Sequence, residues 1–419
     1  MISTTTKEHE VKESLSNRYK NATGAGHDDA FKKAYDFDSS ALLKQLNCYP
    51  YYQVIDQNEG PEAIVNGKLC TMLGSNNYLG LTIDQRVRQA AIDATNKYGT
   101  SLTGSRLLNG THSLHIELEE ELATFLNKEA ALVFTTGYQA NIGITTALLG
   151  SNDHLILDQF NHASITDGAN LSKCVKATYR HNDMEDLEKV LKEVPEGKGK
   201  VIMFDGVFSM EGDICDLPGI TKLAKKYNAR VIIDDAHGIG VMGEAGRGTA
   251  NHFGLENESD LIAGTFSKAL ASVGGYVAGD KKVIERIKHF GRSILFSASL
   301  PPASAAAALE ALKIMQQEPE RVTRLNENAK YMRTKLVEKG FNIGHTTTPI
   351  VPIIVGEDMK ALNLWRELLD EGIYVNSVIY PAVPRNQALL RTSYTSEHTI
   401  EQLDRSLEIL CKMKAKHNF

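Results

Sequence analysis

The sequence predicts an α/β protein with a large, mostly parallel-sheet domain and a smaller C-terminal α/β domain. From Ala131 onward, short apolar runs alternate with helix-length amphipathic segments, which is the order expected of a parallel sheet covered by helices on both faces. A long charged stretch, residues 318–339, then leads into a second and shorter group of strands and helices. Of the 419 residues, 42% are hydrophobic, so each part can bury a core.

The expected elements follow in chain order. Five apolar runs are expected as strands of the large domain: 131–134, 154–157, 201–204, 231–234 and 261–264. Apolar stripes predict helices over 113–126 and 217–227, and an alanine-rich helix over 303–315 opens after Pro301 and Pro302. The second unit has expected strands at 350–355, 373–375 and 389–394, a helix around Leu362, and a final helix after Thr399, whose spacing to Gln402 fits a capping box.

These elements divide the chain into three parts. Residues 1–75 form an N-terminal tail and arm, of which the first 35 or so residues are polar and poor in branched apolar side chains. Residues 76–310 form the large domain. Residues 311–419 form the small C-terminal domain, and the charged stretch between the two is expected to bridge them.

Composition excludes several classes of function. Lys and Arg total 46 against 52 Asp and Glu, a formal charge of −6, which lacks the basic excess of nucleic-acid binding proteins. The five cysteines show no CxxC or Cys/His metal spacing, so we expect reduced thiols in the cytoplasm and no metal site. No apolar stretch approaches the roughly 18 residues of a membrane span, although contact with a membrane surface stays compatible with the sequence.

Reactive side chains follow three of the expected strands, where the ligand of a doubly wound sheet binds. A small-residue turn, 135–141, opens a helix and suits a phosphate, although most such turns are simple caps. Asp234 and His237 follow the fourth strand, and a buried acid there needs a cationic partner unless it caps a helix or binds a metal. Lys268 lies among small and apolar residues, where desolvation favours the neutral, nucleophilic amine; taken alone, a solvent-facing lysine fits equally well.

Together these segments resemble the α-oxoamine synthase family of fold-type I enzymes, which depend on pyridoxal 5'-phosphate (PLP). The resemblance runs from about Ser39 to the C-terminal helix. It rests on ordered motifs at 75–81, 104–111, 136–141, 161–164, 207–213, 234–237, 246–249, 265–268 and 390–399. Because the matches keep their order over nearly the whole chain, they outweigh any single motif.

The resemblance implies roles for four catalytic residues. Lys268 forms the Schiff base with PLP and then acts as base or acid at the substrate Cα. Asp234 pairs with the pyridinium nitrogen, His162 stacks on the ring, and His237 reaches the phenolic oxygen or the bound substrate.

The resemblance also implies further binding residues. Gly137, Tyr138 and Thr265 contact the phosphate, Ser209 supports the ring, and Ser299 completes the phosphate site of the neighbouring subunit, so a homodimer is expected. For the substrate, Arg391 would bind the amino acid carboxylate with help from Asn76.

The implied reaction joins an amino acid to an acyl-CoA with loss of carbon dioxide, giving an α-amino ketone. The motif forms are most similar to the branch that condenses L-serine with palmitoyl-CoA to 3-ketosphinganine. Two departures, at Ile379 and in 101–106, leave serine selectivity open. Glycine C-acetyltransferase and 8-amino-7-oxononanoate synthase share the catalytic set. A non-catalytic partner subunit, which lacks the lysine, fits less well because Lys268 is present; an aminotransferase or decarboxylase would not need the 161–164 and 234–237 motifs.

Overall fold

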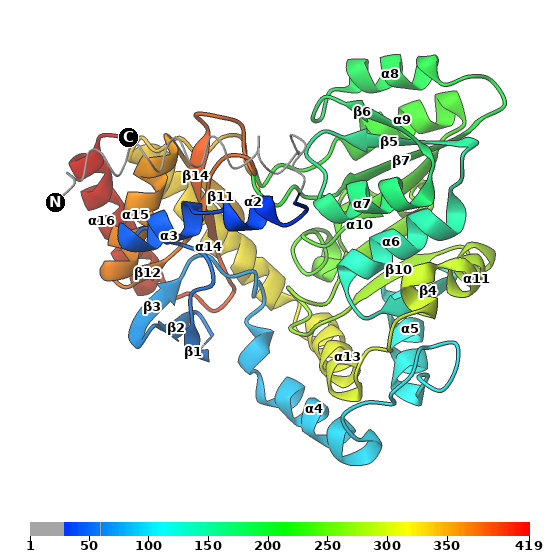
Figure 1. The fold of residues 1–419 in the computed structure, drawn as a ribbon. Helices are drawn as coiled ribbons and strands as arrows, with labels where there is room; N and C mark the ends of the chain where they lie inside the picture. Colours follow the sequence, from blue (N-terminus) through cyan, green and yellow to red (C-terminus); the bar gives the residue numbers. More distant parts are fainter. Residues whose placement is uncertain (1–28, 59) are drawn as a thin grey trace.

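The structure, a computed structural model, describes residues 29–58 and 60–419 and has two halves (Figure 1). Most of the expected N-terminal tail therefore lies outside the described residues. The described chain begins with two short helices, α2 (Lys32–Tyr35) and α3 (Ser39–Gln45), before the first strands. Within the described ranges, no helix combines the length and the apolar character needed to cross a membrane.

The large half is built on a seven-stranded sheet, in the order β4-β10-β9-β8-β7-β5-β6. Its strands are β4 (Ala130–Phe134), β5 (Asp153–Asp158), β6 (Val175–Tyr179), β7 (Gly199–Asp205), β8 (Arg230–Asp234), β9 (Leu261–Thr265) and β10 (Gly275–Gly279). Only β10 among them runs antiparallel to its neighbours, β4 and β9. The mostly parallel sheet predicted from the sequence is confirmed, and β6 and β10 are strands that the pattern analysis did not find.

Helices cover both faces of this sheet, because successive side chains of its strands enter two separate cores. In β5, for example, Ile156 joins the core on one face, whereas Leu155 and Leu157 join the core on the other. The helices of this half are α4 (Gln85–Tyr98), α5 (Ser113–Phe125), α6 (Gly137–Leu148), α7 (Ala163–Ser172), α8 (Met184–Glu193), α9 (Leu217–Tyr227), α10 (Thr249–His252), α11 (Lys281–Phe290), α12 (Arg292–Leu295) and α13 (Pro302–Gln317). Short 3-10 turns are η1 (Leu81–Ile83), η2 (Glu244–Gly246) and η3 (Glu256–Glu258).

The small half combines residues from both ends of the described chain. One sheet has the order β11-β14-β13, and a second has the order β1-β2-β3-β12. The bounds are β1 (Ile55–Asn58), β2 (Glu62–Val65), β3 (Lys68–Met72), β11 (Ile350–Gly356), β12 (Ile373–Tyr374), β13 (Asn376–Val378) and β14 (Ala388–Ser393). The helices are α14 (Glu320–Glu338), α15 (Asp358–Asp370) and α16 (Ile400–His417), the last with the predicted Thr399/Gln402 capping box.

The expected strand at 373–375 pairs with the N-terminal strand β3 and not with the other small-domain strands. The N-terminal arm therefore packs as part of the small half. The domain bounds at 75/76 and 310/311 stay a prediction.

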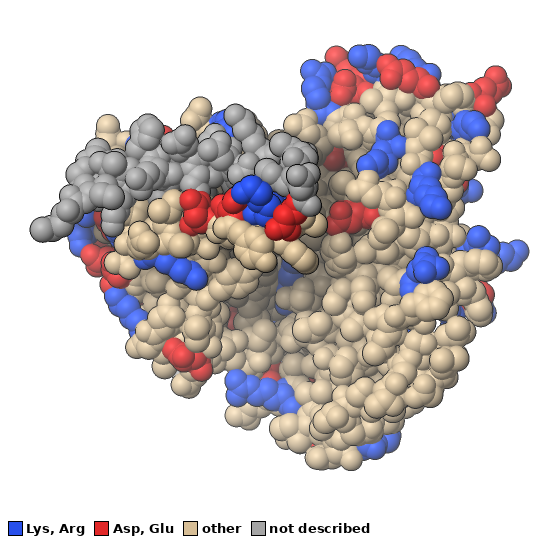
Figure 2. All heavy atoms as spheres, viewed as in Figure 1, with Lys and Arg blue, Asp and Glu red and all other residues tan. Residues whose placement is uncertain are grey.

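Helix α14 passes from one half to the other. Val322 and Leu325 pack in the large core, whereas Ala329 and Met332, further along the helix, pack in the small core. The preceding helix α13 packs on α4 and α5 in the large half. Figure 2 shows a hollow between the two halves, so residues from both can meet there.

Candidate active site

A pocket of about 280 Å³ lies at the carboxyl edge of the large sheet. Three neighbouring strands end there in polar side chains, Asp205 on β7, Asp234 on β8 and Thr265 on β9. Parallel strands bring their carboxyl ends to one edge, which is where the ligands of such sheets bind. The pocket is lined by Thr136, Gly137, Tyr138, Asn141, His162, Ser164, Asp205, Ser209, Asp234, Ala236, His237, Gly264, Thr265, Ser267, Lys268, Val273 and Gly274.

Lys268 lines this pocket, three residues after the end of β9. Burial lowers the pKa of its amine, and the nearby carboxylates of Asp234 and Asp205 offset only part of that effect, so the pKa is about 8. The pKa of an ordinary lysine side chain is about 10.4. The neutral amine, which is the nucleophilic form, is therefore far more populated near neutral pH than in an ordinary lysine. The alternative of a solvent-facing lysine is excluded by the place of Lys268 in the pocket wall.

Asp234 is buried at the end of β8. One carboxylate oxygen accepts a hydrogen bond from the Asn141 side chain at 2.6 Å, and the other accepts from the Ala236 backbone N–H at 3.1 Å. Asp205 is its partner in the β7/β8 register, and burial together with the neighbouring Asp234 raises the pKa of Asp205 well above its usual value. Asp205 therefore favours its protonated, neutral form.

Two histidines lie on the pocket wall, one at its surface and one buried. His162 is exposed; its backbone N–H donates to Asp205 at 2.8 Å, and its Nδ1 lies 2.7 Å from the Ser164 hydroxyl, which fixes the ring. His237 is buried, and its Nδ1 is hydrogen-bonded to the Tyr78 hydroxyl at 2.7 Å. Burial lowers the pKa of His237 well below its usual value, so this imidazole is neutral.

The first turn of α6 forms another part of the wall. The Thr136 hydroxyl caps the helix by accepting from the Gln139 N–H, whereas Gly137 and Tyr138 belong to the first turn, whose N–H groups have no partner within the helix. A Cβ on Gly137 would lie 2.9 Å from the Thr265 Cβ, so glycine permits this close approach. Free N–H groups and the helix dipole favour an anion such as phosphate here.

Arg391 approaches the pocket from the small half, on β14. It is 4% exposed, and its Nε donates to the backbone oxygen of Ser209, a lining residue. One terminal nitrogen donates to the Asn76 side chain at 3.0 Å, and the other donates to Ser393 at 2.8 Å. Arg391 thus contacts both Asn76 and the lining residue Ser209, although neither Arg391 nor Asn76 belongs to the pocket lining.

The hairpin that carries Ser209, residues 207–214, holds the two halves together. The Gly212 backbone oxygen accepts from the Thr346 and Thr348 hydroxyls at 3.1 and 2.9 Å. In the large half, the Nδ1 of His181 is hydrogen-bonded to the Asp158 carboxylate at 2.9 Å, and its Nε2 lies 3.5 Å from the carboxylate of Asp213, which belongs to the hairpin. Burial alone would lower the pKa of His181, but these two carboxylates outweigh it and raise the pKa to about 9.

Ser299 is not among the residues that line the pocket of its own chain, and its backbone N–H donates to the Gly104 oxygen at 3.0 Å. The other predicted residues line the pocket, apart from Arg391, which contacts the lining residue Ser209, and Asn76, which contacts Arg391. Their chemical roles stay predictions. Sequence reasoning missed Tyr78, Asn141 and Asp205. Asp205 could have been found, because it ends an apolar run just as Asp234 does. Tyr78 and Asn141 lie within the motifs at 75–81 and 136–141, but nothing in those motifs marked either residue individually.

Asp235, the acid that follows Asp234 in the chain, has a different task. Its oxygens accept from the Thr249 N–H at 2.8 Å and from the Thr249 hydroxyl at 2.6 Å. Burial raises its pKa to about 6. Asp235 therefore ties the loop after β8 to α10 and is not part of the pocket wall.

The residues present fit PLP, the cofactor that the resemblance implies. The first turn of α6 suits its phosphate, the Lys268 amine suits its aldehyde, and Asp234, whose two hydrogen-bond donors in the structure are neutral groups, suits its pyridinium nitrogen. Among residues 29–58 and 60–419, no group of three His, Cys, Asp or Glu side chains could hold a metal ion.

Comparison with known protein families and sequences gives a consistent result. The family of class I and II aminotransferases matches residues 69–410. A serine palmitoyltransferase from Sphingobacterium spiritivorum is 48% identical over 371 residues, covering 88% of this chain and 93% of that protein. An 8-amino-7-oxononanoate synthase from Thermoanaerobacter pseudethanolicus is 46% identical over 377 residues, covering 90% and 95%.

Solved structures agree in fold. A Sphingomonas wittichii serine palmitoyltransferase has a TM-score of 0.90 at 36% identity, covering 93% of this chain and 99% of that one. A serine palmitoyltransferase from S. paucimobilis with a bound PLP–myriocin aldimine gives the same values. An 8-amino-7-oxononanoate synthase from Francisella tularensis has a TM-score of 0.72 at 28% identity, covering 84% and 99%.

Proposed function

Because the chain belongs to the class I and II aminotransferase family, and within it to the PLP-dependent α-oxoamine synthases, we propose that it condenses L-serine with palmitoyl-CoA to form 3-ketosphinganine. The observation that carries this proposal is the Lys268 amine, with a pKa of about 8, in one pocket with Asp234 and the start of α6. Similarity to serine palmitoyltransferases at 48% identity supports the choice of substrates.

Bound PLP supplies an electron sink that stabilises negative charge at the substrate Cα. Lys268 holds the cofactor covalently and moves the proton at Cα. Asp234 keeps the pyridine nitrogen protonated by pairing with it, and this pairing also relieves the cost of a buried carboxylate. Asn141, which donates to Asp234 at 2.6 Å, fixes the direction of that carboxylate.

The remaining wall residues bind and orient. Gly137, Tyr138 and Thr265 hold the phosphate end, and His162 covers the ring with its imidazole held by Ser164. Ser209 supports the ring edge. Buried, neutral His237 can donate or accept a hydrogen bond at the phenolic oxygen or at the substrate, and Tyr78 fixes its orientation.

Arg391 and Asn76 bind the amino acid carboxylate at the rim, where a guanidinium fork suits a planar anion. In the overall reaction a Cα–H bond breaks and Cα forms a bond to the thioester carbonyl carbon. The C–S bond breaks to release coenzyme A, the carboxylate leaves as carbon dioxide, and a proton returns to Cα. Lys268 is the group placed to remove and return that proton.

A second candidate is 8-amino-7-oxononanoate synthase, which the 46% identity to the Thermoanaerobacter pseudethanolicus protein favours. Ile379, one of the two departures noted in the sequence, packs in a small-half cluster with Leu362 and Ala388, so it gives no contact by which to choose. The two functions differ in the amino acid and in whether the acyl chain ends in a carboxylate.

Release of free coenzyme A tests the proposal. The purified enzyme is incubated with L-serine, glycine or L-alanine, each with palmitoyl-CoA or with an acyl-CoA that ends in a carboxylate. We expect the highest kcat/KM for L-serine with palmitoyl-CoA. Highest activity with L-alanine and the carboxylate-ended chain would assign the second function, and no release with any pair would overturn the synthase assignment.

We also propose that the enzyme is a cytoplasmic homodimer in which Ser299 reaches the phosphate site of the partner subunit. Support comes from the position of Ser299 outside its own pocket and from nearby exposed apolar side chains, such as Phe296, which is 76% exposed. Five free cysteines fit a reducing compartment. Sedimentation is expected to give a dimer, and a monomer with full activity would contradict it.

A further inference from the structure

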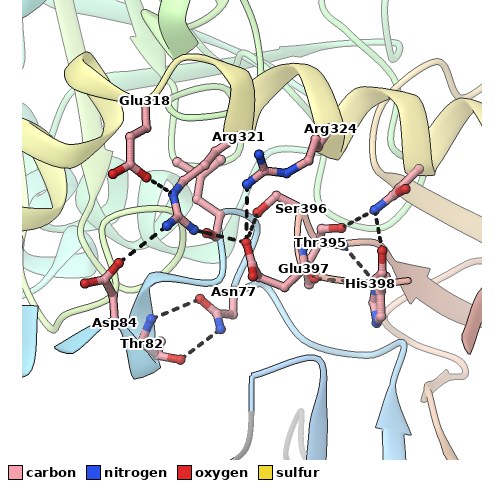
Figure 3. Close-up of polar contacts among 12 residues, drawn as sticks. Asn77, Thr82, Asp84, Glu318, Arg321, Arg324, Thr395, Ser396, Glu397 and His398 are labelled. Carbon is pink, nitrogen blue, oxygen red and sulfur yellow. Dashed lines mark hydrogen bonds and ion pairs between the residues drawn. The ribbon is translucent and has the colours of Figure 1, made fainter. Parts of the chain in front are cut away.

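Arg321, at the start of α14, connects three segments that are far apart in the sequence (Figure 3). Its Nε donates to Glu318 at 2.7 Å. One terminal nitrogen donates to the Leu79 backbone oxygen at 3.1 Å and to Glu397 at 3.0 Å, and the other lies 3.4 Å from Asp84. The Arg321 side chain is only 14% exposed, so these contacts are partly shielded from water, and they form a network and not an isolated surface pair.

Two of these segments continue directly into the proposed carboxylate site. Leu79 follows the segment that carries Asn76, and Glu397 lies six positions after Arg391, in the loop that follows β14. The segments also contact each other, because the Ser396 N–H donates to the Tyr78 backbone oxygen at 2.8 Å. Arg321 therefore holds together the two chain segments that carry Asn76 and Arg391, whose side chains contact each other.

The packing at this junction is close. A Cβ on Gly80, which has a φ of +69°, would lie 2.1 Å from the Glu397 Cγ, so glycine is needed both for the backbone angle and for the space. Asn328, two turns further along α14, donates to the backbone oxygens of Thr395 and His398 at 2.9 and 3.0 Å. The same helix thus fixes this loop at two points.

The charges of the cluster balance. Arg86, Arg321 and Arg324 face Asp84, Glu318 and Glu397. Removal of Arg321 would leave the Glu397 carboxylate with the longer contact to Arg324, at 3.6 Å, and the hydrogen bond from the Ser396 hydroxyl, at 3.2 Å. It would also leave the Leu79 oxygen without this donor. A lysine cannot replace the planar guanidinium here, because its single ammonium group cannot reach four partners that lie on different sides.

We propose that Arg321 is a positioning residue for amino acid binding: it fixes Asn76 against Arg391 by bridging the segment after Tyr78 to the loop after β14. This inference rests on the proposed role of Arg391 as the carboxylate ligand. Arg321 touches neither substrate nor cofactor and acts through the placement of these two segments.

The first test compares Arg321→Gln and Arg321→Lys with Arg324→Gln in the PLP-loaded enzyme. Arg324 is a matched control, since it lies on the same helix, is 46% exposed and, among residues 29–58 and 60–419, pairs with Glu397 alone. For both Arg321 variants we expect the KM for the amino acid to rise about 5- to 30-fold, with kcat changed less than threefold and the visible cofactor spectrum unchanged. The control is expected to stay within about twofold of the parent enzyme.

Glu397→Gln keeps the shape of the side chain and gives a second variant should Arg321→Gln fold poorly; it is expected to change the KM in the same direction. Equal loss of amino acid affinity and cofactor binding in these variants would overturn the proposal, because it would indicate general destabilisation. An unchanged amino acid KM in Arg321→Gln would overturn it as well.

A double-mutant cycle with Arg391→Lys separates this proposal from the function proposed above. If Arg321 acts through Arg391, the effects of the two substitutions on amino acid affinity are less than additive. Full additivity contradicts the positioning role. If Arg391→Lys itself leaves amino acid affinity unchanged, the carboxylate role of Arg391 fails, and that failure is visible before Arg321 is considered.

Hydrogen exchange gives a readout that does not depend on turnover. In the loaded Arg321→Gln enzyme, the Ser396 amide, bonded to the Tyr78 oxygen, is expected to exchange at least about fivefold faster than in the parent. Amides of β8, in the large sheet, are expected to keep their rates. Equal acceleration in both places would contradict a local positioning role.

Discussion

The pocket around Lys268 and the Arg391 site beside it differ in how they are assembled. Asp205, Asp234 and Thr265 end neighbouring strands of one sheet, and Lys268 follows the last of these strands. Asn76 and Arg391, in contrast, are 315 positions apart in the chain and meet at a junction of the two halves. A sheet edge places its residues by its own hydrogen bonds, whereas the second site depends on contacts that hold two segments together.

This difference predicts separable effects. Substitutions in the pocket should change cofactor binding and chemistry, and substitutions at the junction should change amino acid affinity while the cofactor stays bound. The tests below run from the largest expected effect to the smallest.

Replacement of Lys268 should give the largest loss. In Lys268→Ala we expect kcat to fall at least about 1000-fold, since a positioned proton-transfer group alone contributes about 10²- to 10⁴-fold. Turnover is measured by coenzyme A release, with Lys282→Ala, an exposed lysine on α11, as the control. Substantial activity in Lys268→Ala, with a normal control, would refute the role of this lysine.

Replacement of Arg391 should reduce affinity for the amino acid and leave the cofactor in place. Arg391→Lys keeps the charge but loses the fork, and we expect the KM for the amino acid to rise about 30-fold or more. The cofactor spectrum should be unchanged, because Arg391 lies outside the pocket lining. Loss of the cofactor in this variant would show that the two sites are not separable.

Cofactor uptake by the apoenzyme should depend on pH through Lys268. The neutral amine is the reactive form and its pKa is about 8, so the uptake rate should rise about tenfold between pH 7 and pH 9 and then level off. The rate is followed by the growth of visible absorbance after PLP is added. A rise that continues beyond pH 10 would indicate an amine with an unshifted pKa.

Replacement of His181 tests how much the hairpin at 207–214 contributes to the stability of the folded protein, and its expected effect is smaller than those above. Its pKa is raised to about 9 in the folded protein, above its unfolded value of about 6.5. Its stabilisation is therefore fully present below about pH 6.5 and is lost as the pH rises through about 9. In urea unfolding, His181→Gln should cost about 1–3 kcal/mol at pH 6 and should flatten this alkaline decline.

The matched control for that measurement is His289→Gln, because His289 is half exposed and pairs with Glu285 within one helix. We expect it to unfold like the parent at every pH. If His181→Gln kept the same decline between pH 6.5 and 9 as the parent, another group would be responsible for it.

The same comparison explains what the sequence could predict. The strand ends that carry Asp234 and Thr265 were visible as apolar runs, and the helices with clear stripes, such as α5 and α9, occur where expected. Strand β10 was missed because its sequence, Gly275–Gly279, is rich in glycine and short in branched residues. The place of Ile373 beside β3 could not be foreseen, because that pairing joins opposite ends of the chain.

Side-chain contacts between distant parts of the chain were likewise not predictable from the sequence. Asp205 carried a local signal that could have been used, whereas the contact of Asn141 with Asp234 spans 93 positions and that of Tyr78 with His237 spans 159. Such contacts depend on packing between elements, which periodicity within one element does not describe. The Arg321 cluster is of this second kind.

The central claim is that Lys268 holds PLP in the pocket at the sheet edge. Reduction of the PLP-loaded enzyme with borohydride, followed by peptide mapping, tests it most directly, because reduction makes the link between cofactor and lysine permanent. The account predicts one modified peptide, containing Lys268, and loss of the modification when excess L-serine is present before reduction. Modification of another lysine in place of Lys268, or none at all in an enzyme that binds PLP, would contradict it.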